Sequence, residues 1–138
     1  MIKKEKLLLK RNHRLTNIRK NYLNQTISEI VNRKPRFICI EDLNVSGMMK
    51  NRHLSKAVQA QGFFWFRKQL EYRCSDKGIQ LIVADRFYPS SKLCSCCGNI
   101  KKDLKLSDRV YRCACGNMID RDFQASINLK TYGEKFAG

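Results

Sequence analysis

Two short cysteine pairs constrain the fold of this chain more than any other feature. The first pair lies within Cys94-Ser95-Cys96-Cys97-Gly98, and fifteen residues separate Cys97 from the second pair in Cys113-Ala114-Cys115-Gly116. Two pairs of thiolates on adjacent hairpins satisfy the tetrahedral coordination that zinc prefers. A glycine after each pair tolerates the positive φ that ends such a turn. The spacing therefore predicts a structural zinc ribbon with four ligands: Cys94, Cys97, Cys113 and Cys115.

Two details of this segment leave alternatives open. The second pair is Cys-x-Cys, one residue shorter than a usual zinc knuckle, and Cys96 offers a competing thiolate beside Cys97. A redox dithiol, or thiols without a metal, are the other interpretations. Cys39 and Cys74 lie in apolar patterns and are expected to be core residues. Because a closed four-sulfur site is structural, zinc itself is not expected to catalyse a reaction.

The cellular compartment follows from the cysteine count and from the first residues. Seven cysteines are an odd number, and the basic N-terminal segment is followed only by Leu7-Leu8-Leu9, too short for the core of a signal peptide. Both features disfavour a disulfide framework and predict a cytoplasmic protein. No apolar run approaches the roughly 18 residues of a membrane span, so no membrane partner is expected.

The charge of the chain favours a polyanionic partner. The net charge is +16, from 28 basic and 12 acidic residues, and the first 36 residues hold eleven basic and two acidic side chains. Nucleic acid is the first candidate, because neutralising phosphates releases condensed counterions. A solvated basic face or a ribosome-like basic tail is the alternative. The candidate phosphate contacts are Arg11, Arg14, Arg19 and Lys20, and, near the cysteines, Arg86, Lys92, Arg109 and Arg121.

Hydrophobic periodicity predicts alternating helices and strands. We expect helices at residues 12–32, about 56–76 and about 121–132, strands at 37–40 and 79–84, and a loop at 44–56. Pro35 and Gly78 are expected to end the first two helices. The run Phe37-Ile38-Cys39-Ile40 is typical of a strand buried on both faces. Alternation of this kind implies an α/β fold with a mostly parallel sheet, although two strands are few where about five are typical.

Carboxylates lie where such a fold places its chemistry. Glu41 directly follows the first predicted strand, and the carboxyl ends of strands usually carry the ligands of α/β sheets. Asp120 and Asp122 lie between the cysteine segment and the last predicted helix. Two such carboxylates brought together are suited to Mg²⁺, which supports phosphodiester cleavage when paired metals activate water. A helix cap or a surface charge is the alternative for each of them.

Several motifs occur in a fixed order along almost the whole chain. They are Ile40-Glu41-Asp42-Leu43, then Asp85-Arg86-Phe87-Tyr88-Pro89-Ser90-Ser91-Lys92 before the first cysteine pair, then Cys115-Gly116, Asp120-Arg121-Asp122, Ala125 and Asn128. This series resembles the C-terminal half of TnpB (OrfB), the insertion-sequence protein known as a transposase.

The resemblance implies a fold, a reaction and partners. TnpB is an RNA-guided DNA endonuclease with a RuvC-type, RNase H-like domain, related to the compact CRISPR nucleases. The implied fold is a partial RNase H-like (RuvC) α/β fold with an inserted four-cysteine zinc ribbon. Residues 1–92 would form the basic helix and α/β segment, 93–116 the ribbon, and 117–138 the C-terminal segment. Of three catalytic carboxylates, two correspond to Glu41 and Asp122. The implied cofactors are structural Zn²⁺ and catalytic Mg²⁺, and the implied partners are DNA and a guide RNA.

The sequence departs from the family pattern in two places. The first catalytic aspartate of the family lies on a Gly-x-Asp strand upstream of the first helix, and no such strand precedes Leu15. The family's Asp-x-Asn-Ala segment reads Asp122-Phe123-Gln124-Ala125, with Gln in place of Asn. We therefore expect a truncated protein that does not cleave DNA alone and that self-associates through an open sheet edge. A nucleic-acid-binding module that does not cut, and a remnant without a function of its own, are the alternatives.

Overall fold

The computed structural model describes residues 2–50 and 54–138 and contains two compact units. One unit consists of residues 1–35 and 44–79, and the other of residues 36–43 and 80–138. Each unit is built from its own elements, and the candidate site lies in the second.

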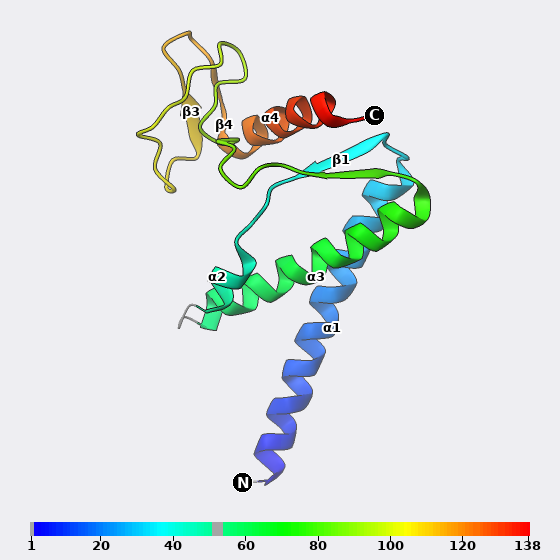
Figure 1. The fold of residues 1–138 in the computed structure, drawn as a ribbon. Coiled ribbons are helices and arrows are strands. Elements are labelled where there is room, and N and C mark those ends of the chain that lie inside the picture. The colour runs from blue at the N-terminus through cyan, green and yellow to red at the C-terminus, as the bar shows by residue number, and fades with distance from the viewer. Residues whose placement is uncertain (1, 51–53) are drawn as a thin grey trace. The chain divides into compact units, whose positions relative to one another are not determined.

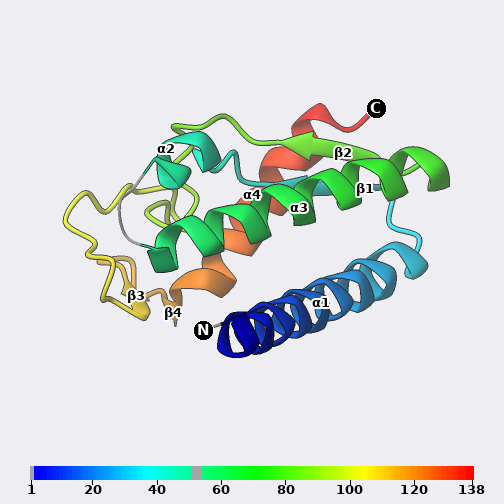
Figure 2. The ribbon, with the colours of Figure 1, turned by 90° about the horizontal axis from the view of Figure 1, so that it is seen from below.

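The first unit is helical. Helix α1 (Ile2–Asn32) packs its C-terminal half against α3 (Leu54–Lys77), and Figure 2 shows the two helices side by side. Ile27 and Val31 of α1 and Leu70 and Cys74 of α3 are buried. The Arg73 guanidinium donates hydrogen bonds to the Asn24 carbonyl and to the Ser28 hydroxyl of α1.

Helix α1 begins about ten residues before the predicted start. Residues 2–22 are exposed, so this part of the helix buries no apolar side chains from which it could have been predicted. Lysine, leucine and arginine dominate it, and these residues have high helix propensity. The helix ends at Asn32, shortly before Pro35, as predicted.

The segment predicted as a loop at 44–56 is partly helical, so that prediction is wrong. Val45–Met49 forms a short helix, α2, and α3 already begins at Leu54; residues 51–53 of the segment lie outside the described residues. The Asn44 side chain accepts a hydrogen bond from the Gly47 N–H at 3.1 Å, which is an N-cap contact. The cap explains why a segment with weak periodicity forms a helical turn. At the other end of α3, Gly78 has φ of 69° and terminates the helix as predicted.

The second unit has a mixed α/β architecture. Strands β1 (Phe37–Ile40) and β2 (Gln80–Val83) pair in parallel, with Phe37 opposite Gln80 and Ile40 opposite Val83. The predicted parallel pairing is therefore confirmed. Helix α4 (Arg121–Phe136) lies beside β1, and a second sheet, the hairpin of β3 (Val110–Arg112) and β4 (Met118–Asp120), leads into it (Figure 1).

Strand β1 is half-buried along its length, so the prediction of burial on both faces is wrong. Phe37 and Cys39 point at Gly133 of α4, where the missing side chain allows close packing. Among the described residues β1 pairs with β2 alone, so the sheet has two strands. The hydrophobic run thus reflects packing against α4 more than a place in the middle of a sheet.

None of the helices described here is both long enough and apolar enough to cross a membrane.

Candidate metal centre and carboxylate pocket

The four predicted cysteine ligands converge on one point. The Sγ atoms of Cys94, Cys97, Cys113 and Cys115 all lie within 4.8 Å of one another. Cys94 and Cys115 are 3.7 Å apart at sulfur, and Cys97 and Cys113 are 3.5 Å apart. A tetrahedron with zinc–sulfur bonds of about 2.3 Å has sulfur–sulfur edges of about 3.8 Å. The four cysteines are therefore positioned to bind a metal ion, and Cys96 is outside the cluster.

Two tight turns bring these sulfurs together. Around the first pair, Cys94 N–H bonds the Asn99 carbonyl at 2.8 Å, and Leu93 bridges Ile100 in antiparallel fashion. Around the second, Cys113 N–H bonds the Asn117 carbonyl at 2.9 Å. The turns end at Gly98 and Gly116, whose φ values are 77° and 94°. Cys-x-Cys is thus long enough for the second turn, because Gly116 completes it.

The electrostatics of the cluster suit a cation. Burial raises the pKa of Cys94, but hydrogen bonds from the Cys97 backbone N–H and the Asn117 side chain outweigh it and lower the value to about 6. The Asn117 backbone N–H lowers the pKa of Cys115, but the neighbouring thiols, Cys113 first, raise it to about 12. Cys94 is therefore ready to ionise while Cys115 retains its proton. A bound cation would favour the thiolate form of these cysteines, because it would offset the repulsion among their negative charges.

A buried tyrosine joins the two turns. Tyr111 of β3 is 0% exposed, and its hydroxyl donates to the carbonyls of Lys92 at 3.0 Å and Asn99 at 3.3 Å. Burial raises its pKa to about 12, so the hydroxyl keeps its proton and remains a donor.

Gln124, the residue that departs from the family pattern, connects the cysteine cluster to α4. Its side chain is 0% exposed, and its Oε1 accepts hydrogen bonds from the Ser95 N–H at 3.2 Å and from the Asn117 amide at 2.9 Å. The same Asn117 amide lies 3.4 Å from the Cys94 sulfur. Gln124 Nε2 has no hydrogen-bond partner among the described residues. The sequence pattern marked Gln124 as unusual but did not indicate this connection.

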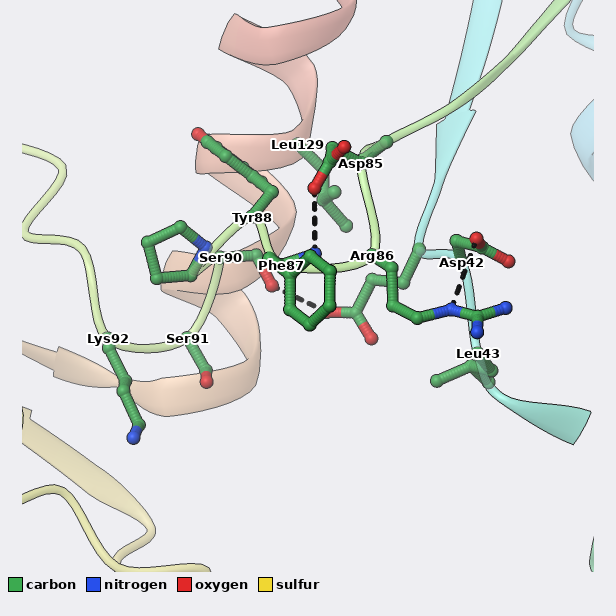
Figure 3. Close-up of a pocket in the computed structure, with 13 residues that line it drawn as sticks. Asp42, Leu43, Asp85, Arg86, Phe87, Tyr88, Ser90, Ser91, Lys92 and Leu129 are labelled. Atoms are coloured by element: carbon green, nitrogen blue, oxygen red, sulfur yellow. Dashed lines mark hydrogen bonds and ion pairs between the residues drawn. The ribbon is translucent and has the colours of Figure 1, made fainter. Parts of the chain in front are cut away.

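Glu41 lies at the carboxyl end of β1, as predicted, and lines a cavity of about 350 Å³. Figure 3 shows this cavity, with its neighbours Asp42 and Ser90 labelled. The loops after β1 and β2 form most of its wall, and Leu129 of α4 completes it. The Ser90 hydroxyl donates to Glu41 Oε1 at 2.6 Å, and the side chain of Ser90 is buried. Sequence reasoning included Ser90 in a family motif but assigned it no contact.

The other two carboxylates of this cavity have different partners. Asp42 Oδ2 lies 3.5 Å from Arg86 Nε, and Asp85 Oδ1 accepts the Phe87 N–H at 2.8 Å (Figure 3). Arg86 and Lys92, two of the predicted phosphate contacts, both line the cavity. The ring of Phe87 also lines it, although 87% of that residue is exposed. The cavity thus combines carboxylates, two cations and an exposed aromatic ring.

A buried amide of α4 holds one wall of this cavity in place. Asn128 is 3% exposed, and its Nδ2 donates to the Ser90 carbonyl at 2.7 Å and to the Leu93 carbonyl at 2.8 Å. The Tyr88 hydroxyl donates to the Asn128 carbonyl at 3.1 Å. These three bonds attach the loop after β2 to α4.

Asp122, the second predicted catalytic carboxylate, is not among the residues that line this cavity. It lies in the first turn of α4, with 75% of its side chain exposed and Arg121 Nε 3.3 Å away. Asp122 and Leu129 share a helix face, because seven residues make two turns, or about 10 Å along the axis. Asp120 caps α4 through the Phe123 N–H at 2.9 Å, so for Asp120 the alternative of a helix cap is correct.

The remaining predicted phosphate contacts occupy different environments. Arg121 is 18% exposed at its side chain and donates to the Leu106 carbonyl at 2.7 Å, which is a structural contact. Arg109 is exposed in the loop before β3. The four basic residues predicted in the first helix all lie in the exposed part of α1: Arg11, Arg14, Arg19 and Lys20.

Comparisons with known proteins agree with the motifs. A family profile described as "Cas12f1-like, TNB domain" matches residues 63–129. A protein of Streptomyces pristinaespiralis named "Putative RNA-guided DNA endonuclease" is 38% identical over 120 residues, which cover 87% of this chain and 30% of that protein. The protein InsQ of Escherichia coli, with the same description, is 30% identical over 126 residues, 80% of this chain and 31% of InsQ.

A solved structure has a similar fold. A chain of the cryo-EM structure of the Cas12f1–sgRNA–target DNA complex superposes with a TM-score of 0.62 at 16% identity, covering 89% of this chain and 35% of that chain. The chain thus spans about a third of the length of these relatives. On the motifs, the family profile and the relatives together, this chain belongs to the TnpB-type family and carries a Cas12f1-like TNB domain.

Proposed function

We propose that this chain contributes a zinc ribbon and part of a RuvC-type, RNase H-like active site to the metal-dependent cleavage of DNA phosphodiesters. The observation that carries the proposal is Glu41 at the carboxyl end of a parallel strand, in a cavity that also contains Arg86 and Lys92. The names of the relatives from Streptomyces pristinaespiralis and Escherichia coli support DNA as the substrate. Their description as RNA-guided, and the guide RNA in the similar Cas12f1 complex, support a guide RNA as a second partner.

The ribbon, residues 93–116, is proposed to hold structural zinc. The sulfur–sulfur distances of 3.5 and 3.7 Å, and the N–H groups directed at the sulfurs, support this ion. Four protein ligands leave no open position, so the ion would stabilise the fold and take no part in cleavage. The hydrogen bonds of Gln124 extend that stabilisation to the start of α4.

Glu41 and Asp122 are proposed to hold catalytic Mg²⁺. When bound, such ions activate water and stabilise the leaving oxygen of the phosphodiester. Glu41 suits this role because its partner is the neutral hydroxyl of Ser90, which leaves the carboxylate charge in place. Asp42 suits it less, because Arg86 already balances its charge. Asp122 would act from the exposed first turn of α4, on the helix face that carries Leu129.

Arg86, Lys92 and Phe87 are proposed to bind the nucleic acid next to Glu41. The two cations would contact phosphates, and the exposed ring would stack on an unpaired base, as in many grooves that hold single strands. The exposed basic residues of α1 would supply a second, sequence-independent phosphate contact.

Metal binding and cleavage can be measured separately on the zinc-loaded chain. Binding of Mn²⁺, followed by electron paramagnetic resonance, should weaken in Glu41→Gln and in Asp122→Asn. Glu134→Gln and Asp103→Asn make the same chemical changes at exposed positions away from the cavity and should bind as the parent does. Unchanged Mn²⁺ binding in Glu41→Gln would overturn the proposed site.

Nucleic-acid binding without cleavage is the second candidate function of the 138 residues alone. The position of Asp122 outside the cavity favours this function. The two other cavity carboxylates favour it as well, because Asp42 pairs with Arg86 and Asp85 accepts the Phe87 N–H. Two-metal cleavage needs carboxylates that hold both ions, and Glu41 is the one cavity carboxylate suited to bind an ion, so a second ion would lack ligands. We therefore expect no metal-dependent nicking of single- or double-stranded DNA by this chain alone. Nicking that disappears in Glu41→Gln would instead establish the chain as an enzyme by itself.

A further inference from the structure

We propose that Ser90 is a positioning residue, which holds the Glu41 carboxylate in the orientation that binds the metal ion. The inference rests on the proposed function, because it assumes that Glu41 is a ligand. The bond from the Ser90 hydroxyl to Glu41 Oε1 is 2.6 Å long, within the range for a hydroxyl donating to a carboxylate. It joins two loops that follow neighbouring parallel strands.

The donor in this bond is buried, and its backbone is hydrogen-bonded on both sides. Ser90 is 5% exposed, and a serine side chain has a single rotatable bond that places its hydroxyl. The backbone of Ser90 is held by its own N–H to the Tyr88 carbonyl at 2.9 Å and by its carbonyl to Asn128 Nδ2 at 2.7 Å. The position of the hydroxyl is therefore set by α4 through Asn128.

The acceptor, in contrast, belongs to an exposed and flexible side chain. Glu41 is exposed, and the side chain of an unrestrained glutamate adopts many rotamers. Binding a metal ion in one of these rotamers costs conformational entropy. A single hydrogen bond to Oε1 restricts these rotamers and leaves most of the four lone-pair positions of the carboxylate available to a cation. Because the hydroxyl is neutral, it orients the carboxylate without balancing its charge, unlike Arg86 at Asp42. Ser90 thus prepares Glu41 for a metal ion without competing with it.

The neighbouring serine provides a matched control. Ser91 also lines the cavity, and the hydrogen bond to Glu41 comes from Ser90. Loss of the Ser91 hydroxyl should leave the orientation of Glu41 unchanged. Removal of either hydroxyl makes a side chain smaller, so neither variant should disturb the fold. Zinc content and far-UV circular dichroism verify this for each protein.

The test is a double-mutant cycle on Mn²⁺ affinity, measured by electron paramagnetic resonance with the zinc-loaded full chain. Ser90→Ala should weaken Mn²⁺ binding about tenfold, the effect of one hydrogen bond to a charged group. Ser91→Ala should bind as the parent does. In the Glu41→Gln background, Ser90→Ala should have no further effect, because a positioning residue acts only through the group that it positions.

The possible results separate the two proposals. If Glu41→Gln weakens Mn²⁺ binding but Ser90→Ala does not, Ser90 has no positioning role and the proposed metal site stands. If Ser90→Ala weakens binding equally in the parent and in the Glu41→Gln background, its effect is a general structural one and the inference is overturned. If Glu41→Gln itself leaves Mn²⁺ binding unchanged, the proposed function fails, and the role of Ser90 fails with it.

Discussion

Gly133 is a position of close approach between α4 and β1, and its replacement by alanine tests that packing. A Cβ atom at residue 133 would lie 2.5 Å from Cε2 of Phe37 and 3.0 Å from Cβ of Cys39. The Phe37 ring is the far end of a flexible, half-buried side chain and can turn away. The Cys39 Cβ is attached to the strand backbone, so β1 or α4 must shift as a whole.

The expected magnitude is the difference between two opposing effects. Overpacking of this kind costs about 1–3 kcal/mol, and the need to move backbone places it in the upper part of that range. Replacing a helical glycine by alanine contributes about 1 kcal/mol in the opposite direction. We therefore expect Gly133→Ala to destabilise α4 by about 1–2 kcal/mol.

Gly62 of α3 is the matched control, because a Cβ there has no atom within 4 Å. Gly62→Ala should retain the helix-propensity gain without the overpacking and stabilise α3 by about 0.5–1 kcal/mol. Amide hydrogen exchange of peptides from the two helices measures both effects locally. Exchange in α4 should become about 5–30-fold faster in Gly133→Ala, since about 1.4 kcal/mol corresponds to tenfold. Slower exchange in α4 would refute the close packing of α4 on β1.

Three further predictions concern the ribbon, the loop after β2 and α1. Cys113→Ser should lower the zinc content of the purified chain from about one ion and loosen residues 93–116, whereas Cys96→Ser should retain the ion; elemental analysis measures both, and full occupancy in Cys113→Ser would contradict the ligand set. Asn128→Leu should destabilise the second unit by about 2–4 kcal/mol in urea unfolding, because two backbone carbonyls lose their donor, and an effect below about 0.5 kcal/mol would show that water replaces it. Affinity for DNA should fall steeply with salt concentration, with little dependence on sequence. A variant in which four basic residues of α1 are neutralised should show a weaker dependence of DNA affinity on salt concentration; it replaces Arg11, Arg14, Arg19 and Lys20. An unchanged salt dependence would show that these charges have a role other than DNA binding.

Features set by neighbouring residues could be predicted from the sequence. Pro35 and Gly78 end α1 and α3 because proline lacks the N–H that continues a helix and glycine adopts a positive φ. The span of β1 and its parallel pairing followed from an apolar run in an alternating pattern. The short helix α2 was missed because a single capping residue, Asn44, stabilises it and hydrophobic periodicity does not reveal it.

The sequence by itself indicated which cysteines could share a metal ion, with Cys96 left as an alternative beside Cys97. A tight turn brings two thiolates together over two or three residues, so spacing alone distinguishes the four clustered sulfurs from Cys39 and Cys74. The order of the motifs likewise identified the family, because a series over almost the whole chain rarely arises by chance. Neither conclusion needed the packing of one element on another.

Only the tertiary structure decided which partner each carboxylate and amide has. Glu41 and Ser90 are 49 residues apart in sequence, and Gln124 lies 29 residues from Ser95. Such pairs meet only when α4 has packed on β1 and the ribbon has folded over the start of α4. The spacing of residues along the chain does not reveal these contacts, because a hydrogen bond depends on the positions of its donor and acceptor atoms to within a few tenths of an ångström. For the same reason Asp122 shared a motif series with Glu41 but does not line its cavity, since seven residues along a helix displace it from Leu129 by two turns.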